Sequence, residues 1–409
     1  MGCILTKVGH DNDLGMPDHD LMLLQSHHLL RTKTTFLSMD LDDISVATRF
    51  QKEEMETKTR RRSRLVYGGG IPGVALDDDR VDLPEFTGVQ EGGYTSINGR
   101  LSWGVRTRAG NDPLRRRKEN QDAFCVCDAM ADDSSATFFS VFDGHGPQGA
   151  FVSHFVREQY HRAVAEAYAE LLLCVSNKNR SGVVVKKASV TCDIVAVLFQ
   201  QAVRRVVEKL DASMIDISVS GTTAVAMLVR DKDVFMANLG DSRAVIARYL
   251  EEEQHYVIHC ETKDHKPDVP EECARIERNN GRVLEWGSYR VWLQDVDTPG
   301  LAMSRSFGDS VAKTVGVTAE PDVTIVEKIS FTSTDRRNGD RPAAFAVLAS
   351  DGIWEFMTTA ECIDFVAACI VDSGKSPQEA CNALIEEAYD RWDAEEDVVD
   401  DITAALVYF

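Results

Sequence analysis

The stretch Thr137-Phe138-Phe139-Ser140-Val141-Phe142-Asp143-Gly144-His145-Gly146-Pro147-Gln148-Gly149 joins an apolar run to an abrupt stop. The run 137–142 is typical of a buried strand, and a helical pattern begins at Ala150. Between them lie three residues that break regular structure, namely Gly146, Pro147 and Gly149. Asp143 is therefore predicted to end a buried strand, in a turn whose glycines allow the backbone to approach a ligand closely.

The composition excludes some classes of function. The 409 residues include 66 acidic and 45 basic ones, for a net charge of −21. An acidic surface argues against nucleic-acid binding, so we expect no nucleic-acid partner. The ten cysteines lack the spacing of zinc ligands and are expected to be reduced thiols in the cytosol. No stretch is long and apolar enough to span a bilayer.

The N-terminus carries a pattern for lipid attachment. Met1-Gly2-Cys3-Ile4-Leu5-Thr6 fits the acceptor pattern for N-myristoylation at Gly2, and Cys3 is a candidate for palmitoylation. One myristoyl chain binds membranes only marginally, whereas two acyl chains anchor a protein stably. We therefore expect a cytoplasmic protein held peripherally on a membrane surface. The alternative is an ordinary start codon followed by small residues.

The chain divides into two parts of different character. Residues 1–95 lack sustained periodicity and are predicted to form a mostly flexible N-terminal extension. Its basic cluster, 58–64, has three open interpretations: contact with an anionic leaflet, a nuclear-localisation signal, or a solvated loop. Residues 96–409 have a globular pattern and are predicted to form one domain.

Residues 96–409 contain runs of consecutive strands as well as helices, and strand and helix alternate in the last third. The expected strands are 101–105, 123–127, 137–142, 222–229, 234–239, 244–247, 344–349 and 402–409. Helices are expected at 151–173, 193–210 and 270–280, and after capping boxes at Thr358 and Ser376. This order predicts an α+β fold in which two packed sheets are covered by helices.

Three of the apolar strands have an aspartate at one end. Asp143 and Asp351 each follow a strand, and Asp400 precedes the last one. Clustered carboxylates at one rim of the sheets would require cations, and oxygen ligands favour magnesium or manganese over zinc. The alternative is three independent turn or cap aspartates.

A series of ordered motifs strengthens the metal interpretation. The chain resembles the metal-dependent type 2C (PPM-type) serine/threonine protein phosphatases from about Trp103 to Phe409. The motifs that carry the resemblance are Arg117-x-x-Asn120-Gln121-Asp122, Asp143-Gly144-His145-Gly146, Ser220-Gly221-Thr222-Thr223, Gly240-Asp241-Ser242-Arg243, 301–309, Glu320-Pro321-Asp322-Val323, Ala349-Ser350-Asp351-Gly352 and Asp400-Asp401-Ile402-Thr403.

The resemblance implies an α-β-β-α sandwich with a two-metal centre at one end. It implies that Asp143 bridges two Mg²⁺ or Mn²⁺ ions and that the Gly144 carbonyl binds one of them. Asp351 and Asp400 would hold the other ion. Asp241, together with Asp351, is where some members hold a weaker third metal.

The resemblance also implies a reaction and its catalytic residues. A hydroxide bridging the metals would attack the phosphorus of phosphoserine or phosphothreonine in a protein substrate. Asp122 would support metal-bound waters, Arg117 would bind the substrate phosphate, and His145 would be the general acid. Alternatively, Arg117 belongs to a solvated basic loop and His145 is a structural turn residue. A monomer is expected.

Two positions depart from the family pattern. Gln121 stands where many members have glutamate, and Asp401 replaces the usual asparagine. Because no predicted metal-binding carboxylate is lost, we expect an active enzyme; the alternative is a catalytically silent scaffold or binding module at a membrane. Three aromatic residues of the variable flap, about 265–318, are expected either to contact substrate protein or to pack in the core: Trp286, Tyr289 and Trp292.

Overall fold

The computed structural model describes residues 64–68, 89–95, 101–180, 192–231, 233–326 and 341–409. The predicted lipidation residues Gly2 and Cys3 lie outside the described residues. So do residues 58–63 of the basic cluster. Within the part that is described, no helix has the length and apolar character needed to cross a membrane.

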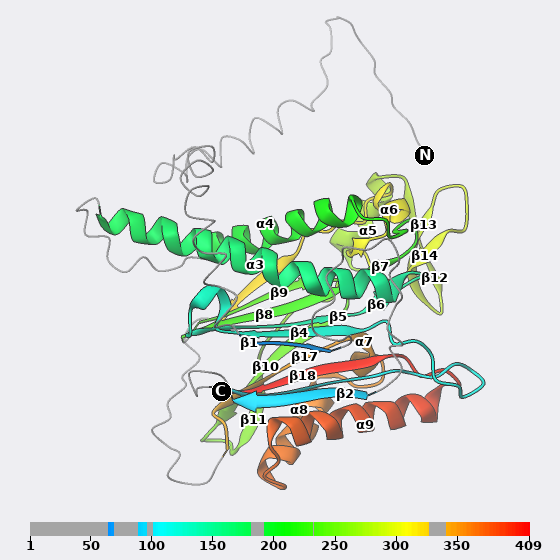
Figure 1. Cartoon of the computed structure of the whole chain (residues 1–409). Helices are drawn as coiled ribbons and strands as arrows, with labels where there is room; N and C mark the ends of the chain where they lie inside the picture. Colours follow the sequence, from blue (N-terminus) through cyan, green and yellow to red (C-terminus); the bar gives the residue numbers. More distant parts are fainter. Residues whose placement is uncertain (1–63, 69–88, 96–100, 181–191, 232, 327–340) are drawn as a thin grey trace, which may run out of the picture. The chain divides into compact units, whose positions relative to one another are not determined.

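Two six-stranded antiparallel sheets form the centre of the fold (Figure 1). The first contains, in spatial order, β1 (Arg64–Gly68), β4 (Ala123–Asp128), β5 (Ala136–Phe142), β8 (Ala224–Arg230), β9 (Asp233–Leu239) and β16 (Asp322–Val326). The second contains β11 (His255–Glu261), β10 (Arg243–Leu250), β17 (Ala344–Ala349), β18 (Ile402–Tyr408), β3 (Ser102–Arg108) and β2 (Val89–Thr95). The predicted sheet-on-sheet core is confirmed.

Alternation along β5 shows why the strands are apolar on both faces. Phe139 packs between the two sheets with Trp103 of β3, whereas its neighbour Phe138 packs under the helices. Successive side chains of a strand point to opposite faces, so a sheet buried on both sides needs a continuous apolar run. Residues 137–142 therefore contribute side chains both to the core between the two sheets and to the core between the first sheet and its helices.

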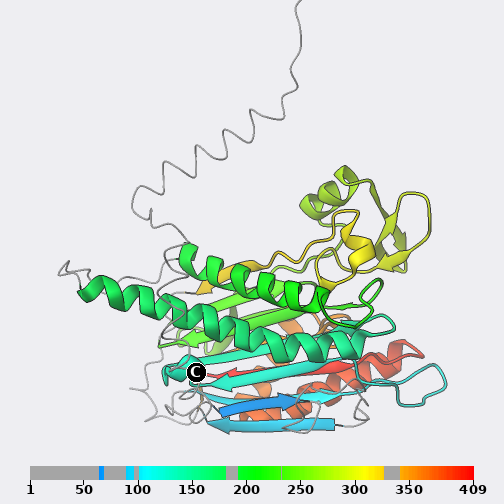
Figure 2. The same cartoon turned by 45° about the horizontal axis from the view of Figure 1, so that its top comes forward.

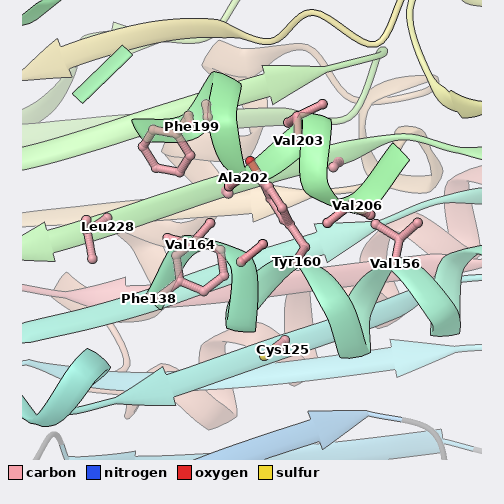
Figure 3. Close-up of a cluster of buried hydrophobic side chains, with 14 of the residues drawn as sticks. Cys125, Phe138, Val156, Tyr160, Val164, Phe199, Ala202, Val203, Val206 and Leu228 are labelled. Atoms are coloured by element: carbon pink, nitrogen blue, oxygen red, sulfur yellow. The ribbon is translucent and has the colours of Figure 1, made fainter. Parts of the chain in front are cut away.

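A pair of helices covers the outer face of each sheet (Figure 1). The first sheet is covered by α3 (Gly149–Arg180) and α4 (Cys192–Asp211), and the second by α8 (Thr359–Val371) and α9 (Pro377–Glu395). Figure 3 shows Tyr160 of α3 between the strands and α4. Its ring meets those of Phe138 and Phe142 edge-on, at centroid distances of 6.0 and 6.2 Å. Such aromatic pairs contribute about 0.5–1.5 kcal/mol beyond their buried area.

The predicted helix starts after residue 358 are confirmed. At α8 the Thr358 hydroxyl accepts from the amide of Glu361, whose carboxylate accepts from the Thr358 amide. Ser376 and Glu379 make the same reciprocal bonds at the start of α9. Each box satisfies two amides that a helix terminus otherwise leaves unpaired.

Two strands lie within the segment that the sequence assigned to the extension. β1 pairs with β4 along 64–68, and β2 pairs with β3 along 89–95. They occupy edge positions in the first and second sheets, respectively. The folded region therefore starts before residue 96, because these segments add their backbone hydrogen bonds to the edges of the sheets.

A smaller unit, which we call the flap, is inserted between β11 and β16. It contains α5 (Pro270–Arg278), β12 (Gly281–Trp286), β13 (Ser288–Leu293), β14 (Pro299–Leu301) and α6 (Ser310–Lys313), and it projects beyond the sheets (Figure 2). Trp286 is 70% exposed and Tyr289 is also exposed, so packing in the core does not explain these two aromatics.

Candidate active site

Three aspartates meet where strands of the two sheets end. Asp143 follows β5, Asp241 lies just after β9, and Asp351 follows β17. One carboxylate oxygen from each lies within 4.8 Å of those of the other two. Two of the strands belong to the first sheet and one to the second, so the group joins the ends of both. We call these three residues the carboxylate group. The sequence assigned Asp241 to it only through the family resemblance.

The backbone at Asp143 is held by the strand β7 (Gly221–Thr222) and the residue that follows. The Asp143 carbonyl accepts from the Thr223 amide at 2.9 Å and from the Thr222 hydroxyl at 3.0 Å. The Asp143 amide donates to the Thr223 hydroxyl at 3.1 Å. At Gly144 a Cβ atom would lie 2.5 Å from the Gln121 carbonyl oxygen, so only glycine fits there.

The carboxylate group is electrostatically crowded. Burial, followed by the charge of Asp351, raises the pKa of Asp143 well above its usual range. Burial and the charges of Asp241 and Asp400 raise the pKa of Asp351 to about 7. Oδ1 of Asp241 is buried and has no hydrogen-bond partner among the described residues. Close acidic oxygens, one of them without a donor, form a donor set that fits hard divalent cations.

A lysine already neutralises one member of this group. The Lys266 ammonium lies 2.6 Å from Oδ2 of Asp241. Burial opposes its charge, but Asp241 and Asp351 outweigh burial and raise the pKa of Lys266. Nothing in the local sequence marked Lys266 as part of this group.

Asp400 lies near the carboxylate group but outside it. Its carboxylate pairs with Lys118 and accepts from the Asp401 amide at 2.7 Å. It is close enough to raise the pKa of Asp351. Its role as a metal ligand stays a prediction.

Asp401 and Gln121, which depart from the family pattern, form hydrogen bonds to backbone groups near Asp143. The two oxygens of buried Asp401 accept from the amides of Gly110 and Gln121 at 2.8 and 2.9 Å. The side-chain amide of Gln121 donates to the Gly146 carbonyl at 2.9 Å. Both residues therefore support the turn around Asp143 through hydrogen bonds.

Asp122 is buried beside the same backbone. Its carboxylate accepts from the Ser350 hydroxyl at 2.8 Å, which ties it to the start of α7 (Asp351–Trp354). Burial, and then the charge of Asp401, raise the pKa of Asp122 well above its usual value. Its charge in turn helps to raise the pKa of Asp143, so Asp122 lies close to the carboxylate group.

Arg117 differs from the neighbouring arginines of the basic loop, residues 115–118, in having no ion-pair partner among the described residues. Arg116 pairs with Asp112, and Arg115 pairs with Asp393 of α9. Arg117 is exposed and has no ion-pair partner among the described residues. Its backbone bridges to Asn111, which also bridges to Val399, next to Asp400. The structure thus leaves one guanidinium of the loop free for an anion.

His145 is paired with Asp309. Nε2 of His145 lies 2.7 Å from Oδ2 of Asp309, and both residues lie beside β7. Burial disfavours the charged imidazole, but Asp309 outweighs it and raises the pKa of His145. Asp309 occupies the N-cap position of α6, yet its side chain makes no capping bond there.

Residues 109–396 match the family model described as Protein phosphatase 2C. The chain belongs to the protein phosphatase 2C family. It is 32% identical over 339 residues to probable protein phosphatase 2C 35 of Arabidopsis thaliana, covering 76% of this chain and 85% of the relative. It is 36% identical over 277 residues to probable protein phosphatase 2C 61 of the same plant, covering 67% and 74%.

Solved structures share the fold. The serine-threonine phosphatase 2C from Toxoplasma gondii aligns with a TM-score of 0.62 at 22% identity, covering 79% of this chain and 99% of that chain. Proteins of the 2C family are metal-dependent protein serine/threonine phosphatases. The enzyme class predicted from the sequence is therefore confirmed.

Proposed function

We propose that this protein phosphatase 2C hydrolyses phosphoserine and phosphothreonine in proteins with two Mg²⁺ or Mn²⁺ ions. Asp143, the Gly144 carbonyl, Asp351 and Asp400 would hold these ions. The observation that carries the proposal is the carboxylate group, which joins both sheets and includes an unpartnered buried oxygen. Such ions, when bound, acidify water to a nucleophile near neutral pH and neutralise charge on the phosphoryl group.

The chain's own residues then bind the substrate and move protons. Arg117 holds the phosphate, because a free guanidinium can bind two phosphate oxygens at once. His145 donates a proton to the departing serine or threonine oxygen. Asp122 accepts hydrogen bonds from the waters beside the carboxylate group, and the Ser350 hydroxyl holds its carboxylate in place.

A weaker third ion belongs to the same proposal. Asp241 and Asp351 would hold it, and the crowding of their charges supports cation binding at this point. Lys266 competes for Asp241, since its ammonium already lies at one oxygen. The third ion would therefore bind more weakly than the first two.

The test is hydrolysis of a phosphothreonine peptide. We expect phosphate release with Mn²⁺, none with a chelator, and a loss for Asp143→Asn that exceeds the loss for His145→Asn. Hydrolysis that survives chelation and Asp143→Asn would overturn the metal mechanism. Absence of hydrolysis in every divalent metal, by protein that still binds Mn²⁺, would support a catalytically silent scaffold instead.

We also propose that the enzyme is a monomer attached peripherally to a cytoplasmic membrane surface by acylation of Gly2 and Cys3. The sequence pattern at residues 1–6 supports the acylation. Wild type should fractionate with membranes, Cys3→Ser should bind them weakly, and Gly2→Ala should be soluble, because two chains are needed for stable attachment. Equal fractionation of the wild type and Gly2→Ala would contradict the anchor.

A further inference from the structure

We propose that Asp309 is a positioning residue that holds the His145 ring in the orientation needed for proton donation to the leaving oxygen. The inference rests on the proposed role of His145 as the general acid. Its basis is the direct contact between a buried carboxylate and one ring nitrogen.

Three two-residue strands bring the pair together. β6 (Gly144–His145) and β15 (Phe307–Gly308) flank β7, so that His145 pairs with one side of Gly221 and Gly308 with the other. Phe307 is anchored by an edge-on contact with Tyr160 of α3, at a centroid distance of 5.9 Å. The turn that carries Asp309 is thus fixed to the helix layer.

Gly221 provides the space for this contact. A Cβ atom there would lie 2.1 Å from Oδ2 of Asp309 and 2.7 Å from Nε2 of His145. Asp309 itself has a φ of +51°, a left-handed backbone that is uncommon for residues other than glycine. The Asp309 amide donates to the Ser220 carbonyl at 2.9 Å, and its carboxylate also accepts from the Ser306 hydroxyl. Several contacts therefore hold this carboxylate in a single place.

The contact determines which ring nitrogen can act. Because Nε2 is engaged by Asp309, Nδ1 is the nitrogen left for the substrate; it is buried and has no hydrogen-bond partner among the described residues, so the ring must become accessible at Nδ1 when the substrate binds. As water oxygen bonds to phosphorus, the bond from phosphorus to the serine or threonine oxygen breaks. The electron pair stays on that oxygen, which takes the Nδ1 proton, while the neutral ring keeps its Nε2 proton on Asp309.

The test compares two substrates that differ in their need for a general acid. A phosphothreonine peptide releases a poor leaving group, whereas p-nitrophenyl phosphate releases a good one that needs little protonation. For Asp309→Asn we expect kcat to fall about 10- to 100-fold on the peptide and less than about threefold on the aryl ester. KM should change little on either substrate. A merely structural role would lower both activities alike.

A double variant tests whether Asp309 acts through His145. Asp309→Asn should cost nothing further in a His145→Asn background, because the ring it orients is gone. Asp322→Asn is the matched control, since Asp322 pairs with His265 at 3.1 Å in a second His–Asp contact. This control should leave the ratio of the two activities at the wild-type value.

Two failures can be told apart. If His145→Asn lowers both activities equally, the general-acid role of His145 is wrong, and the role of Asp309 falls with it. If His145→Asn selectively lowers peptide hydrolysis but Asp309→Asn does not, only the inference about Asp309 is overturned. An additive loss in the double variant would also overturn it. Each of these outcomes is independent of whether hydrolysis requires a divalent metal.

Discussion

Lys266 places its ammonium nitrogen 2.6 Å from Oδ2 of Asp241, so the chain supplies its own cation at the carboxylate group. The other oxygen of Asp241 has no hydrogen-bond partner among the described residues. A metal ion at Asp241 and the lysine ammonium would repel each other. The lysine is therefore expected to weaken the binding of one metal ion selectively.

Lys266→Met should tighten the weakest Mn²⁺ binding step on the order of tenfold, because one competing charge is removed. Titration calorimetry of the metal-free enzyme measures this directly. Lys263→Met is the control, since Lys263 is exposed and pairs with Glu271 instead. Weaker Mn²⁺ binding by Lys266→Met would show that the lysine organises the site and does not compete for it.

The raised pKa of Asp351 makes the stability of the metal-free enzyme depend on pH. A group whose pKa is about 7 when folded and 3.8 when unfolded stabilises the fold at low pH, and this contribution is lost as the pH rises through about 7. In a chelator, Asp351→Asn should thus be more stable than the wild type at pH 8, on the order of 1 kcal/mol, and its advantage should be smaller at pH 5, where only the unfolded-state carboxyl is ionised.

Thermal unfolding of both proteins at the two pH values checks this prediction. The comparison between variants matters because burial lowers the pKa of His154 and His161, which makes the whole protein respond to pH in the opposite sense. At pH 8, Mn²⁺ should make the wild type more stable than Asp351→Asn, since the ion binds the ionised wild-type carboxylate. An advantage of Asp351→Asn that is equal at pH 5 and pH 8 would argue against the raised pKa.

The sequence predicted the strands, because these follow from local apolar runs, but of the three strand-end aspartates expected to meet, Asp400 lies outside the carboxylate group. Asp143 and Asp351 meet as expected, since each directly follows a buried strand. Asp241 could be assigned only by resemblance. The partners Lys266 and Asp309 were not predicted, because hydrogen bonds between residues far apart in the chain depend on how the flap folds back.

The same limit applies to the basic loop and the edge strands. Nothing in the run Arg115-Arg116-Arg117-Lys118 shows which charge is free, since that depends on Asp393, which is distant in the sequence. β2 carries two adjacent glycines, at 92 and 93, which weaken a strand pattern. This segment forms a strand because its backbone hydrogen bonds to β3 stabilise an extended conformation that its own residues favour only weakly.

Arg117→Ala should lower kcat/KM for a phosphothreonine peptide about 10- to 100-fold, which corresponds to the loss of one hydrogen-bonded charge. Arg117→Lys should recover only part of this loss, because an ammonium cannot bind phosphate bidentately. Steady-state kinetics of Arg116→Ala provides the comparison, as that guanidinium is occupied by Asp112. Equal losses in Arg116→Ala and Arg117→Ala would mean that the loop acts only through its total charge.

Glu272 connects the flap to the rest of the domain, and its charge should be essential for stability. Its buried carboxylate accepts from Arg275 at 2.6 and 2.7 Å and from Arg305 at 2.7 Å, and Arg305 also pairs with Asp322 at the start of β16. Burial opposes the ionised form, but the two guanidinium groups outweigh it and hold the pKa of Glu272 below its usual range.

Glu272→Gln keeps the shape of the side chain but leaves two guanidinium groups without their counter-charge. Removing one partner of a buried ion pair typically costs about 3–5 kcal/mol, so the midpoint of urea unfolding should fall markedly. Limited proteolysis should also cut the flap faster, because α5 loses its tie to β16. Glu277→Gln, an exposed position on the same helix, should unfold like the wild type. If both variants unfold like the wild type, the flap must be held by its apolar cluster around Ile276 and Val291 alone.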